Sequence, residues 1–171
     1  MLPRRFGLFV LVFAVCYVSD VLSKIVAVHR LEPGHSVEIV GDFFTLYLIR
    51  NPGAAFSMGE RFTVFLSCLA VVATVVAWRF AWLTRHRGWA VGIGLVGAGV
   101  LGNLTDRLLR EPGPMRGHVV DFFRLPNWPI FNVADICINV GAGLILLLAL
   151  RGISYDGTRE ESAGSAKEGD A

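Results

Sequence analysis

Two aspartates in the last third of the chain stand where a carboxylate is costly. Asp121 is flanked on each side by two large apolar residues, and Asp135 lies about one turn inside a long apolar run. Two carboxyl groups a few ångströms apart cannot both ionise easily, so they share one proton. Such a pair can activate water for attack on a peptide carbonyl and can protonate the leaving amine. If the two lie close together, these residue types therefore offer acid–base chemistry, in which one carboxylate activates water and the other carboxyl donates a proton.

Each aspartate also has a purely structural interpretation. Asp135 fits a helix N-terminus, where the helix dipole stabilises a negative charge, and Asn132 and Asn139 share its helix face. Asp121 belongs to residues 110–129, whose several prolines and glycines predict a loop. The spacing alone leaves open whether this loop folds back and brings Asp121 to Asp135.

Further polar side chains occur within apolar runs, where an ionisable group costs about 2.5–3.5 kcal/mol on insertion scales. Asp20 and Lys24 are spaced i,i+4 and can pair on one helix face, either as an internal brace or as an orienting group beside a site. Asn103 and Arg107 have the same spacing and resemble hydrogen-bond donors that lack acceptors. Gly99 and neighbouring glycines indicate close packing between membrane helices.

Four apolar stretches are long enough to cross a bilayer, which takes about 20 residues. The chain has 171 residues, of which 54% are hydrophobic and only 18% charged, and its mean hydropathy is +0.57. We predict spans at about residues 6–28, 62–83, 89–109 and 131–150. Arg4 and Arg5 precede the first span as in a signal peptide, but its length and the three later spans predict that it is retained.

The basic residues near the span ends predict the orientation. They gather before the first span, around the turn between the second and third, and after the fourth, so both termini are expected to be cytoplasmic. β-branched and aromatic residues predict a β-rich segment at about residues 34–57, with a turn at Asn51-Pro52-Gly53. Because unpaired strands cannot lie in lipid, this extracytoplasmic segment should rest at the membrane interface.

The predicted fold class is therefore an all-α membrane protein with four transmembrane helices and a small extracytoplasmic β-rich segment at the interface. Residues 1–153 form one membrane domain. Residues 154–171 are rich in Gly, Ser, Glu and Asp and are predicted to be a disordered cytoplasmic tail.

Composition also excludes some functions. A net charge of +2 without a basic patch argues against nucleic acid. Cys16, Cys68 and Cys137 lie in apolar runs and match no metal-binding pattern, so we expect no metal and no other cofactor. A transporter that uses the buried charges as a relay and a purely structural subunit are the rival classes. The first usually shows internal repeats, and none is apparent here.

Five sequence blocks, in order, resemble the lipoprotein signal peptidases, also called signal peptidase II. The resemblance covers about residues 6–150, and the blocks are residues 20–24, 51–57, 102–107, 117–122 and 131–135. Each block alone is a weak signal, whereas five in order on a four-span chain are specific. The chain departs from the family at Val21, where Gln is frequent, at Pro52, and in a longer stretch at residues 109–116.

The resemblance implies an aspartic endopeptidase whose catalytic pair is Asp121 and Asp135. It also implies supporting roles for the polar residues Asp20, Lys24, Asn51, Asn103, Arg107 and Asn132. To these we add Gly53, Gly99 and Ala134 as further candidate site residues. The implied substrate is a prolipoprotein whose lipobox cysteine carries a diacylglyceryl group, cut just before that cysteine. The enzyme would lie in the bacterial cytoplasmic (inner) membrane, with its active site on the extracytoplasmic side. Membrane lipid and globomycin-type inhibitors are the other expected partners, and the chain is expected to act as a monomer.

Overall fold

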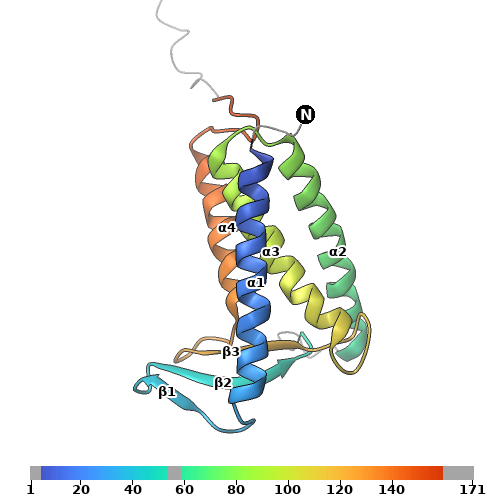
Figure 1. Cartoon of the computed structure of the whole chain (residues 1–171), viewed down its shortest axis with the longest axis vertical. Helices are drawn as coiled ribbons and strands as arrows, with labels where there is room; N and C mark the ends of the chain where they lie inside the picture. Colours follow the sequence, from blue (N-terminus) through green and yellow to red (C-terminus); the bar gives the residue numbers. More distant parts are fainter. Residues whose placement is uncertain (1–4, 54–58, 160–171) are drawn as a thin grey trace, which may run out of the picture.

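Four long helices form a bundle, and a small sheet closes one end of it (Figure 1). The structure is a computed structural model that describes residues 5–53 and 59–159. The helices are α1 (Phe6–Arg30), α2 (Gly59–Leu83), α3 (Arg87–Leu109) and α4 (Val133–Leu150). All four are long and apolar enough to cross a membrane. The four predicted spans and the predicted fold class are confirmed, with boundaries that shift by at most three residues.

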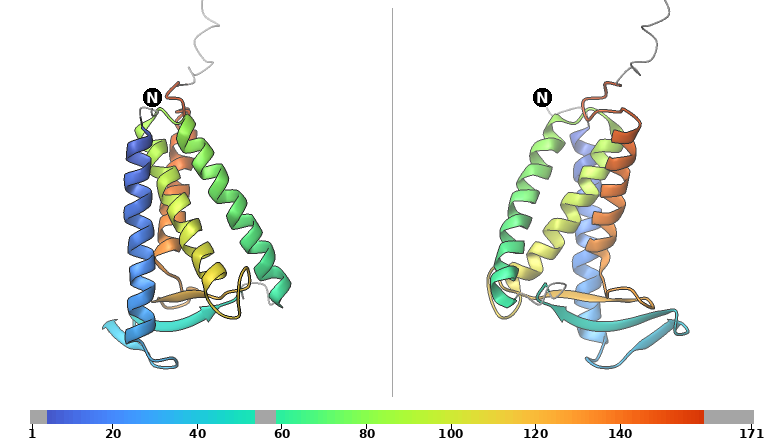
Figure 2. Two further views of the ribbon diagram at one scale, coloured as in Figure 1. Left: turned by 45° about the vertical axis from the view of Figure 1, so that its right-hand side comes forward. Right: turned by 180° about the vertical axis from the view of Figure 1, so that it is seen from behind.

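Helix α3 is the centre of the bundle, because α1, α2 and α4 all pack against it (Figure 2). Half of its span is buried, compared with 11% for α1 and 22% for α2 and α4. Its glycines allow this close contact. A Cβ at Gly99 would collide with the carbonyl oxygen of Ala134, and one at Gly92 would lie 2.8 Å from Ile145 Cγ1. The small residues of α3 therefore serve helix packing, as we predicted.

The sheet contains a strand, β3, that we did not predict. β1 (Val37–Val40) pairs antiparallel with β2 (Phe44–Asn51), and β2 pairs antiparallel with β3 (Val119–Arg124). β3 lies within the segment that we predicted to be a loop, so that prediction is wrong for residues 119–124. Its first four residues are all buried, and a strand buried on both faces lacks the alternation by which strands are recognised.

An apolar cluster attaches the sheet to the bundle. Its buried members come from α1, β2 and β3, and they are Ala27, Leu31, Leu48, Val120 and Phe122. A second cluster fixes the opposite end of the bundle, with Phe9, Ala77, Ala81, Ala90 and Ile93 as its buried members. The polar side chains discussed below lie next to the first cluster, where the sheet meets the helix ends.

The C-terminal segment is ordered further than we predicted. The backbone N–H groups of Arg85 and His86 donate to the carbonyl oxygen of Tyr155 at 2.9 and 3.2 Å. Trp89 Nε1 donates to the carbonyl oxygen of Ile153 at 2.8 Å. The prediction of disorder is therefore wrong for residues 154–159, whereas residues 160–171, like residues 54–57 of the second sequence block, lie outside the described residues.

The contact between α3 and α4 predicts a large effect of one methyl group. Gly99→Ala should lower the thermal unfolding midpoint in detergent by the equivalent of about 1–3 kcal/mol, because the new Cβ meets the Ala134 carbonyl and the helices must separate. Gly143→Ala on α4 is the matched control, because a Cβ there meets nothing within 4 Å. Equal midpoints for the two variants would contradict the proposed contact.

Candidate active site

One asparagine connects the two aspartates that the sequence singled out. Asn132 is the N-cap of α4: its Oδ1 accepts from the N–H of Asp135 at 3.0 Å, and Asp135 Oδ2 accepts from the N–H of Asn132 at 3.1 Å. The same side chain donates from Nδ2 to Asp121 Oδ1 at 2.6 Å. The question left open by the spacing is thus answered, since β3 brings Asp121 to the first turn of α4.

Asp121 is held on its other side by the end of β2. Asn51 Nδ2 donates to Asp121 Oδ2 at 2.8 Å, and Asn51 Oδ1 accepts from the N–H of Gly53 at 2.8 Å. Gly53 has φ +99°, a conformation that side chains rarely adopt, and a Cβ there would lie 2.9 Å from Leu66 Cδ1. A glycine at this position therefore fixes the Asn51 side chain, which in turn fixes Asp121.

The surroundings of Asp121 favour its protonated form. The side chain is 2% exposed, and burial raises the pKa of Asp121 from 3.8 to about 6. The hydrogen bonds from Asn51 and Asn132 oppose this shift, and the negative charge of Asp135 adds to it. A carboxyl with a pKa near neutrality beside a second carboxylate is suited to proton transfer.

Asp135 is held by the central helix. Asn103 Nδ2 donates to Asp135 Oδ1 at 2.9 Å, while Asn103 Oδ1 accepts from Asn132 Nδ2 at 3.1 Å and from Lys24 Nζ at 3.0 Å. A cavity of about 240 Å³ opens beside Asp135, lined by Trp128, Phe131, Asp135, Ile136, Asn139 and Val140. Asp135 is therefore fixed by amides on one side and reachable on the other.

Arg107 lies near both aspartates. Its Nη1 donates to the carbonyl oxygen of Asn103 at 3.3 Å, and the charges of Asp121, Asp135 and Asp106 act on its guanidinium. Among the described residues its buried Nε has no hydrogen-bond partner. The guanidinium thus has donor capacity left for another molecule's acceptor.

A buried ion cluster lies directly behind the site. Lys24 Nζ is 2.8 Å from Asp20 Oδ2 and 2.9 Å from Asp106 Oδ2, and its side chain is 1% exposed. Asp20 Oδ1 accepts from the N–H of Ala134 at 2.8 Å, next to Asp135. Asp106 Oδ2 accepts from the N–H of Val120 at 3.2 Å, next to Asp121. Each acid of the cluster therefore fixes the backbone beside one member of the aspartate pair.

The described residues thus bring together every site residue that we predicted. Gly99 and Ala134 act through the backbone contact between α3 and α4. Asp106 is the residue that we missed, although its place three residues after Asn103 in an apolar helix was a usable signal. In the part of the chain that the structure describes, no group of three or more His, Cys, Asp or Glu is placed to hold a metal ion.

Comparisons with known proteins give one consistent result. The family model described as "Signal peptidase (SPase) II" matches residues 12–151. The chain is 48% identical over 157 residues to a protein of Rhodococcus jostii named "Lipoprotein signal peptidase", covering 92% of this chain and 79% of that one. It is 43% identical to the protein of that name from Mycobacterium tuberculosis, covering 90% and 76%. A solved bacterial membrane enzyme superposes with a TM-score of 0.76 at 26% identity, covering 91% of this chain and 94% of that one.

The ion cluster predicts that Asp106 is needed for stability. Asp106→Asn should lower the unfolding midpoint in detergent by the equivalent of about 1.5–3 kcal/mol, because a neutral amide replaces an acceptor shared by Lys24, Arg110 and the Val120 N–H. Asp42→Asn, at an exposed position of the β1–β2 connection, is the control and should leave the midpoint unchanged. An Asp106→Asn midpoint equal to that of the control would refute this role.

The raised pKa of Asp121 predicts how stability depends on pH. The folded chain binds the Asp121 proton more tightly than the unfolded chain does, so this contribution is fully present below about pH 4 and is lost as the pH rises to about 6. Between pH 4 and pH 7 the unmodified chain should lose about 2.4 kcal/mol relative to Asp121→Asn. Thermal unfolding of both proteins across this range measures the difference, and a constant difference would rule out the raised pKa.

Proposed function

The chain belongs to the signal peptidase II family, and on that premise we propose how its residues carry out the reaction. It is a multi-pass protease of the bacterial inner membrane that removes the signal peptide from prolipoproteins. Our proposal is that Asp121 and Asp135 form the catalytic pair, which makes the chain an aspartic endopeptidase. The observation that supports it best is the hydrogen-bonded sequence Asp121–Asn132–Asp135 at the sheet end of the bundle.

In the proposed reaction the pair begins with one shared proton. The ionised carboxylate takes a proton from water as the water oxygen attacks the scissile carbonyl carbon, and the protonated carboxyl donates to the developing oxyanion. The gem-diol intermediate then collapses: the carbonyl bond re-forms, the C–N bond breaks, a carboxyl proton passes to the leaving amine, and a gem-diol hydroxyl proton returns to the other carboxylate, so that the pair again holds one proton. The shared proton and the proton taken from water both belong to the pair, so neither aspartate has a single fixed role.

The surrounding donors have proposed roles that follow from their contacts. Asn103 and Asn132 hold the two carboxyl groups in their relative orientation. Arg107 is proposed to donate from its unpartnered Nε to a carbonyl oxygen of the substrate, which fixes the scissile bond over the aspartates. Asp20, Lys24 and Asn51 act through these groups and are positioning residues.

The substrate is proposed to be the diacylglyceryl-modified form of the prolipoprotein, cut just before the lipidated cysteine. The cavity beside Asp135 fits such a substrate, because four of its six lining side chains are apolar and Asp135 is its single carboxyl group; Asn139 is the other polar residue. Membrane lipid is the surrounding partner, and exposed apolar residues of the β1–β2 region suit contact with the membrane surface; they are Val37, Ile39, Val40 and Phe43. Globomycin-type inhibitors are proposed to occupy the same site, and the chain to act as a monomer.

The proposed orientation places both termini in the cytoplasm and the active site on the extracytoplasmic side. Supporting this, the start of α1 and residues 154–159 lie at one end of the bundle and the sheet at the other (Figure 1). A transport function gains no support, because Asp20, Lys24 and Asp106 pair with one another at one end. Among the described residues, these charged side chains do not form a row that crosses the membrane-spanning part of the bundle.

Substitution of either aspartate tests the proposed mechanism. Asp121→Asn and Asp135→Asn should each lower the cleavage rate of a diacylated prolipoprotein at least about 100-fold, because proton transfer needs both carboxyl groups. Both variants should still insert and should keep a cooperative thermal transition in detergent. Asp42→Asn is the matched control and should cleave at the unmodified rate. Turnover by either site variant within tenfold of the control would refute the aspartate pair.

A further inference from the structure

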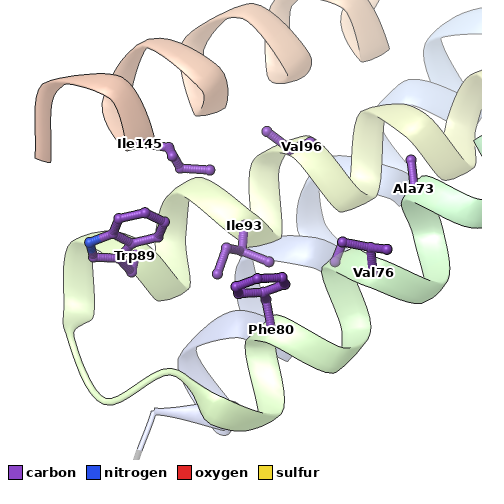
Figure 3. Close-up of a pocket in the computed structure, with 8 residues that line it drawn as sticks. Ala73, Val76, Phe80, Trp89, Ile93, Val96 and Ile145 are labelled. Atoms are coloured by element: carbon purple, nitrogen blue, oxygen red, sulfur yellow. The ribbon is translucent and has the colours of Figure 1, made fainter. Parts of the chain in front are cut away.

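Two hydroxyl side chains near the start of α2 are buried in a largely apolar helix. Thr63 is 1% exposed and Ser67 is fully buried, and the two share one helix face because they are four residues apart. A buried hydroxyl costs free energy unless it is hydrogen-bonded. At its other end α2 lines an apolar groove of about 290 Å³ together with α3 and α4, to which it contributes Val76 and Phe80 (Figure 3). Among the described residues of α2, the buried polar side chains thus lie at the sheet end of the bundle.

Both hydroxyls donate to carbonyl groups outside α2. Thr63 Oγ1 donates to the carbonyl oxygen of Pro52, in the turn after β2, at 2.5 Å. Ser67 Oγ donates to the carbonyl oxygen of Met115, in the segment between α3 and β3, at 2.8 Å. Ser67 Oγ also lies 2.9 Å from the carbonyl oxygen of Thr63, which is the local bond that a helical serine can make by itself. The bonds to Pro52 and Met115 are different, because they join α2 to two segments that are distant in the sequence.

Both of these segments lead to Asp121. Pro52 directly follows Asn51, whose Nδ2 donates to Asp121 Oδ2 at 2.8 Å. Met115 lies shortly before the start of β3, and β3 is the strand that carries Asp121. The two segments that α2 holds are thus the one that places Asp121 and the one that places its hydrogen-bond donor.

We propose that Thr63 and Ser67 are positioning residues of the protease: through the two segments that they hold, they fix Asp121 in the aspartate pair. This inference rests on the proposed function, because the positioning matters for cleavage only if Asp121 takes part in it. In the part of the chain that the structure describes, the two hydroxyls bond to carbonyl oxygens, so they act through the backbone. The packing of α2 supports the same turn, since a Cβ at Gly53 would lie 2.9 Å from Leu66 Cδ1.

This role predicts a change in the chemical step with little change in affinity. If the turn after β2 is released, the Asn51 amide holds the Asp121 carboxylate less well, and it is this hydrogen bond that lowers the pKa of Asp121. Removing a hydroxyl from α2 leaves in place the charges that act on Asp121; these are Asp135, Lys24 and Arg107. The pH at which the pair loses its shared proton should therefore rise. The rate constant kcat should fall, because the carboxyl groups are less well oriented.

Removal of the Thr63 hydroxyl tests this role. Thr63→Val keeps the shape of the side chain and should lower kcat for a diacylated prolipoprotein about 5- to 20-fold, with KM within about twofold. It should also move the alkaline limb of the pH–kcat profile to higher pH. Thr63→Ser keeps the donor and should restore both. Thr74→Val is the matched control and should change neither, because the Thr74 hydroxyl donates within its own helix, to the Ala70 carbonyl at 2.8 Å.

Two results would overturn the proposal. One is an unmodified kcat and an unmoved alkaline limb in Thr63→Val. The other is a loss that Thr63→Ser does not restore, since a role that depends on the hydroxyl must survive this change.

Ser67→Ala gives an independent and milder test, which also covers the case in which Thr63→Val does not fold. It removes one oxygen atom and frees the Met115 carbonyl, so kcat should fall at least about threefold and the alkaline limb should again move to higher pH. An unmodified kcat and pH profile in Ser67→Ala would overturn the claim that α2 holds the segment before β3.

Thermal unfolding against pH reads the same change without requiring cleavage. The loss of stability that accompanies deprotonation of Asp121 should extend to higher pH in Thr63→Val than in Thr74→Val. Adding Asn51→Ala to both proteins should abolish this difference, because the bond through which Thr63 acts is then absent from each. Identical curves for Thr63→Val and Thr74→Val, or a difference that persists with Asn51→Ala, would overturn the proposal. If Asp121→Asn still cleaved the substrate, the aspartate pair would fail, while these curves would still decide the role of Thr63.

Discussion

The ion cluster around Lys24 is the interaction on which the rest of the site depends. A buried ammonium is tolerated only if its charge is matched and its hydrogen bonds are made, and Asp20, Asp106 and Asn103 meet both conditions. Each of the two acids also accepts from the backbone N–H of the residue that precedes one of the two candidate aspartates. The separation between Asp121 and Asp135 is thereby tied to a single lysine on α1.

The sheet contributes the other half of the site. β2 ends at Asn51, whose side chain donates to Asp121. β3 carries Asp121, and its pairing with β2 holds this residue next to the bundle. The antiparallel register places Asp121 opposite Ile49 and Val119 opposite Asn51, while Val120 and Phe122 anchor the strand in the apolar cluster below. The sheet is thus part of the framework that holds Asp121, and it also covers the helix ends.

The two ends of the bundle have different chemistry, and this division suits a protease whose substrate lies in the membrane. Among the described residues, the buried charged side chains Asp20, Lys24, Asp106 and Asp121 lie at the sheet end, where Asp135 borders a cavity of about 240 Å³. The opposite end offers an apolar groove of about 290 Å³. Both share the central helix α3, whose glycines let α4 approach closely enough to carry Asp135. Close helix packing and the position of the site therefore have a common cause.

The sequence by itself determined the four spans, because an apolar run of about 20 residues has few other stable environments. It also singled out the aspartates and their donors, because charges and amides are rare in such runs. Only the tertiary structure decided that residues 119–124 form a strand and that Asp106, as well as Asp20, holds a neighbour of the site. Strand pairing joins residues about 70 positions apart, and a burial pattern without alternation gives no local signal of it. Contacts between distant segments depend on how the whole chain packs, so no local pattern could have fixed them.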